Sequence, residues 1–192
     1  MKLQERIKAY RIPIIGVIGL LAIWFLFFRD SSGGGTLTQK EFENKLKDLS
    51  NGKITITDSK SKPFDKGDGT GLYTANWNGF MITSRLEKNG KLSNTYGVIT
   101  KQAGYMDEIS LGQYHDLIQY LIRISNPDLS VDDVQLIVDN ELNFNQQIMT
   151  GEKHTTSKGG MYYQISGGEK PVNFYMFMIM DEDGYNRIKD KG

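Results

Sequence analysis

Residues 12–28 form a run of 17 residues with no charged and no strongly polar side chain, and this run constrains the chain more than any other feature. As an α-helix it would be roughly 25 Å long, close to the thickness of the hydrocarbon core of a bilayer. A backbone that crosses lipid must satisfy its own amides, so an isolated run of this length can cross only as a helix. The sequence therefore predicts one transmembrane helix at residues 12–28.

The charges around this run predict its orientation. Residues 1–11 contain four basic residues and one acid, whereas Arg29 and Asp30 cancel on the other side. The positive-inside rule then places residues 1–11 in the cytoplasm and the remainder outside the cell membrane. Aromatic rings favour the lipid–water interface. Four aromatic residues near the outer end are expected there: Trp24, Phe25, Phe27 and Phe28.

Two other interpretations of the run are less favoured. A cleaved signal peptide has a shorter apolar core, about 7–15 residues, followed by small residues at the cleavage site. Here bulky aromatic residues continue to Arg29, although Ser31, Ser32 and Gly33 are small enough for cleavage. A buried helix of a globular core would be expected to have a polar face, which this run lacks.

The composition of the remaining chain favours a bacterial envelope. The chain has no cysteine, which excludes disulfides, thiolate metal sites and cysteine nucleophiles. It also lacks an N-x-[ST] glycosylation sequon. Residues 30–192 contain 18 basic and 22 acidic residues, and this acidic balance argues against non-specific binding to nucleic acid.

Three helices are predicted after a flexible glycine-rich tether at residues 29–36. Thr38 and Glu41 have the spacing of a capping box, and Asn51-Gly52 would end that first helix. Ser110 would begin a second helix that stops before Pro127, and Ser130 would cap a third. We expect one extracytoplasmic domain at residues 37–188 and a frayed tail at residues 189–192.

Strand patterns group into hairpins. Asn78-Gly79 and Asn89-Gly90 are typical of two-residue turns and would join strands at residues 71–77, 80–87 and 91–100. Residues 58–71 are polar and rich in turn formers, so a long exposed loop is expected there. The other candidate strands are residues 54–56, 152–157, 161–166 and 171–180. Together these predict an α+β fold, a two-layer domain with an antiparallel sheet of five to six strands and about three helices.

Residue types that could hold a metal do not form a recognisable site. Neither His115 nor His154 has a partner at metal-ligand spacing. Methionines at 176, 178 and 180 could offer thioethers to Cu(I), but Val172 and Phe174 share their parity, which favours the buried face of a strand. The acids at 65, 68 and 181–183 do not match a calcium loop and are interpreted as solvated turns. We therefore predict no metal.

Motifs for other chemistry are also absent. The glycines at 67, 69 and 71 precede a strand instead of the helix that a phosphate loop requires. Ser59 and Lys62 match S-x-x-K, but in a loop and without companion motifs, and no G-x-S-x-G is present. We therefore predict no cofactor and no catalytic residue.

Aromatic residues on the predicted sheet supply the candidate binding face. Tyr73, Trp77 and Tyr96 fall in the first meander, and exposed aromatic rings on a sheet suit protein or sugar binding. Core filling is the simpler interpretation of the same residues. The favoured function is a non-enzymatic, membrane-anchored protein that binds an envelope partner or serves in an assembly. The alternatives are an envelope hydrolase using carboxylates, and a sensor with an apolar pocket lined by residues 172–180.

Overall fold

The computed structural model describes residues 35–64, 69–100, 106–167 and 174–189. The predicted membrane helix, its orientation charges, the four interface aromatic residues and most of the tether lie outside these ranges. Within them, no helix combines the length and the apolar character needed to cross a membrane.

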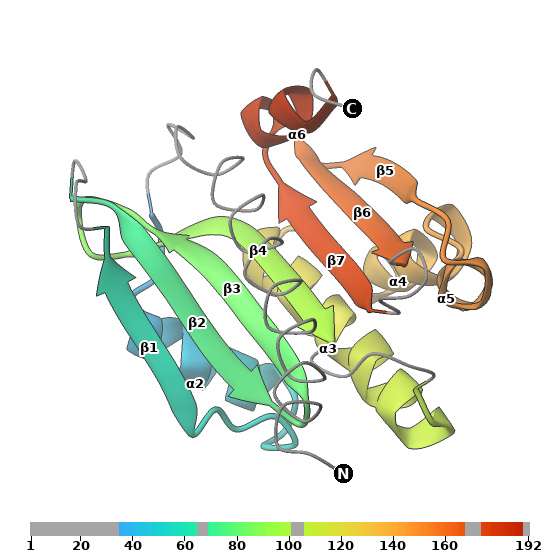
Figure 1. Ribbon diagram of the computed structural model, residues 1–192, viewed down its shortest axis with the longest axis horizontal. Coiled ribbons are helices and arrows are strands. Elements are labelled where there is room, and N and C mark those ends of the chain that lie inside the picture. Colours follow the sequence, from blue (N-terminus) through green and yellow to red (C-terminus); the bar gives the residue numbers. More distant parts are fainter. Residues whose placement is uncertain (1–34, 65–68, 101–105, 168–173, 190–192) are drawn as a thin grey trace, which may run out of the picture.

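Seven antiparallel strands form one sheet in the order β1-β2-β3-β4-β7-β6-β5 (Figure 1). Two meanders, β1 to β4 and β5 to β7, meet where β4 pairs with β7. The α+β class and the antiparallel sheet are confirmed, with more strands than predicted. The strands are β1 (Asp58–Pro63), β2 (Gly71–Trp77), β3 (Phe80–Leu86), β4 (Leu92–Thr100), β5 (His154–Lys158), β6 (Met161–Gly167) and β7 (Tyr175–Met180).

Two predictions for residues 54–63 are wrong. Residues 58–63 were expected in an exposed loop, but they pair with β2 along their whole length. This is an edge strand with almost entirely exposed side chains, so it has no apolar alternation that could reveal it. Residues 54–56 form no strand. Ile54 is 1% exposed, so its apolar pattern reflects burial without backbone pairing.

The helices that cover the sheet lie on one of its faces, behind it in Figure 1. They are α2 (Gln39–Leu49), α3 (Glu108–Ser125), α4 (Val131–Gln135), the π-helical turn η1 (Leu136–Glu141) and α5 (Phe144–Thr150). A last helix, α6 (Glu182–Lys189), contacts β6 and β7 at one end of the sheet.

Two of the three predicted helix starts are confirmed, whereas α5 and α6 were not predicted. Thr38 forms the expected capping box with Glu41, and Ser130 forms one with Asp133. At α3 the expected cap was wrong, because Asp107 is the N-cap and its carboxylate accepts a hydrogen bond from the Ser110 amide at 2.7 Å. An aspartate is as good a cap as a serine, so the helix begins earlier.

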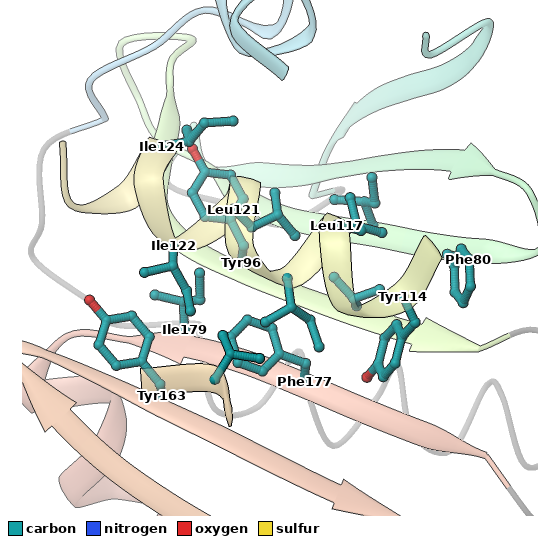
Figure 2. Close-up of a cluster of buried hydrophobic side chains, with 14 of the residues drawn as sticks. Phe80, Tyr96, Tyr114, Leu117, Leu121, Ile122, Ile124, Tyr163, Phe177 and Ile179 are labelled. Carbon is teal, nitrogen blue, oxygen red and sulfur yellow. The ribbon is translucent and has the colours of Figure 1, made fainter. Parts of the chain in front are cut away.

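A closed core fills the layer between the sheet and the helices. Leu117, Leu121 and Ile122 of α3 project toward the sheet, where they face residues such as Tyr96, Phe177 and Ile179 (Figure 2). All of these are 0% exposed. Burial of this many large apolar side chains is the main stabilising term of the fold.

The methionines of β7 are packed on the face of the sheet opposite the helical layer. Tyr175, Phe177 and Ile179 face the helices and belong to the main core. Met178 and Met180 are buried in a second, smaller cluster with Met176 packed against it. Tyr185 of α6 packs there too, and its ring stacks on Tyr162 of β6 at 4.1 Å. Burial of Met178 and Met180 was predicted correctly, but α6 and not the helical layer packs against them.

Candidate functional site

Two of the three residues of the predicted binding face are buried in the core. Tyr73 and Tyr96 are each 0% exposed. The Phe42 ring of α2 stands edge-on to Tyr73 at 5.6 Å and stacks on Tyr96 at 5.1 Å. Alternation along β2 and β4 directs both rings under α2. For these two residues the core-filling interpretation is therefore correct, and the candidate binding face is wrong.

Burial also changes the acid–base behaviour of these tyrosines. Desolvation raises the pKa of Tyr73 well above its ordinary value, and the nearby Glu43 carboxylate raises it further. Desolvation alone raises the pKa of Tyr96. Both phenols are therefore neutral and inaccessible at physiological pH.

Trp77 is the predicted residue that does lie at the surface, and it borders a cleft. The cavity has a volume of about 290 Å³. Three parts of the chain build it: the connection after α2, the β2–β3 turn and one side of α3. Its lining residues are Lys53, Ile54, Trp77, Asn78, Gln113, Asp116 and Tyr120.

The β2–β3 turn positions the aromatic wall of this cleft. Asn78 and Gly79 have φ angles of 45° and 84°, the left-handed values that a two-residue I′ turn requires. The turn leaves Trp77 half-buried at the end of β2, where its ring stacks on Phe80 at 5.9 Å. Phe80 is in turn stacked on Tyr114 of α3. The indole is therefore held from behind by core rings.

One side of α3 supplies three more lining residues. Gln113, Asp116 and Tyr120 are spaced three and four residues apart, which places them in a row along the helix. The other side of α3 is fixed in the core, so this row is held against the turn. Ile54 adds a buried apolar residue to the lining, and its amide donates a hydrogen bond to the Ser50 hydroxyl at 2.9 Å.

The polar groups of the cleft are largely unused. Within the described part of the chain, the side chains of Lys53, Asn78, Gln113 and Tyr120 make no hydrogen bond. Asp116 lies 3.9 Å from His115 Nδ1, which is its one polar side-chain contact among the residues that the structure describes, and its side chain is 51% exposed. These groups can therefore bind a ligand without first breaking contacts inside the protein.

The chain enters the described domain at the other end of the sheet. The Thr36 amide donates to the Leu92 carbonyl at 3.0 Å, and the Leu92 amide donates to the Leu37 carbonyl at 2.6 Å. Leu92 pairs with Leu86 at the start of β4, whereas Thr100 at its other end pairs with Phe80, next to Trp77. The nine residues of β4, roughly 30 Å, separate this entry point from the cleft end.

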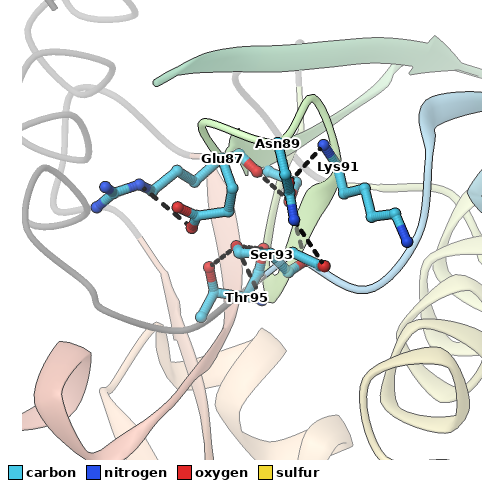
Figure 3. A network of polar contacts seen from close by, with 8 residues as sticks. Glu87, Asn89, Lys91, Ser93 and Thr95 are labelled. Atoms are coloured by element: carbon cyan, nitrogen blue, oxygen red, sulfur yellow. Dashed lines mark hydrogen bonds and ion pairs between the residues drawn. The ribbon is translucent and has the colours of Figure 1, made fainter. Parts of the chain in front are cut away.

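Polar contacts at the β3–β4 hairpin hold this entry point (Figure 3). The Asn89 side chain donates to the Gly35 carbonyl at 3.4 Å and accepts from the Lys91 amide at 3.0 Å. Beside it, Arg85 Nε lies 3.3 Å from Glu87 Oε1 in an ion pair that is almost fully buried. The attachment is therefore fixed to the sheet at Gly35.

The two histidines lie apart and outside the cleft lining. His115 Nε2 is 2.6 Å from Asp139 Oδ1 of η1, and its ring stands edge-on to Phe144. His154 begins β5 and contacts Gln147. In the ranges described, no three or more His, Asp or Glu side chains are grouped so that they could hold a metal ion. Asp181, one of the acids near the C-terminus, accepts from the Gly184 amide at 2.7 Å and so helps to begin α6.

Most of the residues that line the cleft were not predicted from the sequence. Trp77 alone was identified, because Lys53 and Asn78 are ordinary turn residues in sequence. The row Gln113, Asp116 and Tyr120 is the signal that could have been used, since it forms a polar stripe beside the apolar stripe of α3. Whether this polar stripe lines a cleft depends on which part of the chain lies next to α3, and the sequence does not show that.

Comparison with known proteins gives no relative. No protein-family model matches the chain, and neither the curated proteins nor the solved structures include a significant match.

Proposed function

We propose that this chain is a non-enzymatic, membrane-anchored binding protein of a bacterial envelope, which holds its cleft outside the cytoplasm and away from the membrane. One observation carries this proposal: the cleft beside Trp77 lies at the end of the sheet opposite the entry point at Gly35. A chain anchored at residues 12–28 and tethered through residues 29–36 would present such a cleft outward.

The contents of the cleft support binding over catalysis. Its lining contains one carboxylate, Asp116, whereas a two-carboxylate hydrolase needs a pair roughly 5–10 Å apart. It contains no histidine and no serine beside a base. The apolar sensor has less support, because Phe177 and Ile179 are packed in the closed core and line no part of this cleft.

Protease treatment of intact protoplasts tests the anchored topology. An outward domain is expected to be digested while residues 1–11, carrying an epitope tag, stay protected inside. Digestion of the domain only after the membrane is lysed would overturn the orientation. Release of an untagged domain into the medium would favour the cleaved signal peptide instead.

Site-specific photocrosslinking in cells tests the cleft. A photoreactive amino acid at Asn78, exposed on the rim, is expected to capture a ligand or partner. The same residue at Asn140, exposed on η1 far along the chain, is the matched control. Equal adducts from both positions, or none from Asn78, would contradict a binding role for the cleft.

A further inference from the structure

We propose that the cleft binds one ring of a neutral saccharide, with the ring against Trp77 and its hydroxyls on the polar row of α3. This inference rests on the proposed function, because it assigns a ligand class to the same cleft. It starts from three properties of the lining: aromatic surface, balanced charge and small volume.

The aromatic surface fits a ring that is apolar on one face. Trp77 at the end of β2 and Tyr120 of α3 both line the cleft, and the buried Ile54 adds apolar surface to it. Trp and Tyr are amphipathic, with a large apolar body and one polar group at the edge. A sugar ring matches them, because its C–H groups form an apolar face while hydroxyls project around its rim.

The polar lining fits hydroxyl groups better than ions. Asn78, Gln113 and Tyr120 can each donate and accept hydrogen bonds, and a hydroxyl does both as well. Lys53 and Asp116 have opposite charges. The Asp116 carboxylate would therefore repel an anion, and the Lys53 ammonium would repel a cation. Balanced charges and mixed donors favour a neutral ligand with many hydroxyls.

The volume limits the ligand to about one ring. Ligand pockets usually span about 300–1,000 Å³, and this cleft has about 290 Å³. Lys53, Asn78 and Asp116 are exposed at its rim. A longer glycan could therefore enter with one ring in the cleft and the rest of its chain in solvent.

Tryptophan fluorescence gives a direct test because the chain has two tryptophans, Trp24 and Trp77. In the full-length variant Trp24→Phe, held in detergent or nanodiscs, the emission reports on Trp77 alone. Titration with glucose and with N-acetylglucosamine is expected to give a saturable change in emission. No change with either sugar would overturn the inference.

Matched substitutions locate the site. In the Trp24→Phe background, Gln113→Ala removes an amide that would hydrogen-bond to the sugar and should weaken sugar binding by about 2–10-fold. Gln135→Ala changes an exposed glutamine on α4 and should leave the affinity unchanged. An equal effect of both variants, or no effect of Gln113→Ala, would contradict the site.

Other probes separate this inference from the proposed function. Alanine as a zwitterion, inorganic phosphate and tetramethylammonium are titrated in the same way. If one of them changes the Trp77 emission and the sugars do not, the saccharide inference fails while the binding cleft stands. If the photocrosslinker at Asn78 captures nothing, the proposed function itself fails.

Discussion

The Tyr73 hydroxyl donates a hydrogen bond to Glu43 Oε1 at 3.1 Å, which links β2 to α2 through the core. The same carboxylate oxygen accepts from Ser59 of β1 at 2.7 Å and from Gln39 at 3.0 Å. Glu43 therefore joins the edge of the sheet to the helix above it. Tyr73, expected at an exposed face, is a structural residue of this network.

Replacing Tyr73 by phenylalanine should destabilise the fold. Tyr73→Phe keeps the ring against Phe42 but removes one donor from Glu43. A hydrogen bond to a charged acceptor is worth about 1–2 kcal/mol in a partly buried position. Urea unfolding of the full chain, followed by circular dichroism, should show a lower free energy of unfolding by that amount. An unchanged midpoint would mean that the network adds no stability.

Tyr114→Phe should have the opposite or no effect. The Tyr114 side chain is fully buried, and its hydroxyl has no hydrogen-bond partner within the described part of the chain. Its ring stacks on Phe80 at 5.4 Å, and phenylalanine retains that contact. Removing an unpaired buried hydroxyl should leave stability unchanged or raise it by up to about 1 kcal/mol. A loss as large as that of Tyr73→Phe in the same unfolding measurement would show that the hydroxyl has a partner.

The ion pair between α4 and β5 should make stability depend on pH in the acid range. Lys158 Nζ lies 2.6 Å from Asp133 Oδ1, and the Ser130 hydroxyl also donates to this carboxylate. These contacts lower the pKa of Asp133 from 3.8 to about 2. Because the pKa is lower in the folded chain, the carboxylate stabilises the fold above its unfolded pKa, and this stabilisation is lost as the pH falls through the folded value.

Substitution at Lys158 tests this dependence. Lys158→Met should be less stable than the wild-type chain at neutral pH, and the difference should shrink as the pH falls from about 4 to about 2. Lys153→Met, at an exposed lysine directly before β5, is the control and should show no such change. Chemical unfolding at a series of pH values measures the difference, and a constant difference across this range would contradict the assignment.

Two glycines should respond in opposite directions to alanine. A Cβ at Gly71 would lie 2.5 Å from the Lys62 carbonyl oxygen, so Gly71→Ala must displace β1 from β2. Such overpacking costs about 1–3 kcal/mol. Gly112 lies inside α3, and nothing lies within 4 Å of the position that an added methyl group would occupy, so Gly112→Ala should stabilise the chain by about 0.5–1 kcal/mol. Thermal unfolding of both variants should give midpoints on opposite sides of the wild-type value.

Much of the local structure was predictable because it depends on neighbouring residues. The two Asn-Gly turns, the capping boxes at Thr38 and Ser130 and the apolar stripe of α3 follow from contacts a few residues apart. These signals predicted strands β2, β3 and β4 and the helices α2 and α3, but they did not predict α5 or α6. They failed at β1, whose polar, exposed side chains give no period, and at α3, where Asp107 and Ser110 both suit a cap.

The candidate site was less predictable because its parts are distant in sequence. Lys53, Trp77 and Gln113 come from three elements, and only packing brings them to one cleft. The same limit explains the error at Tyr73 and Tyr96. Period-two alternation indicates that each of these residues shares a face with the residues two positions away along its strand. It does not indicate which face of the sheet the helices cover.

The sequence by itself determined the class of the fold, most of its elements and the expectation of an anchor at residues 12–28. Those conclusions depend on composition, periodicity and turn chemistry, which are local properties. Tertiary structure decided that Tyr73 and Tyr96 belong to the core, that the β7 methionines face α6, and that Trp77 borders a cleft. These depend on which surfaces meet when two meanders join through β4 and β7, and no local pattern encodes that meeting.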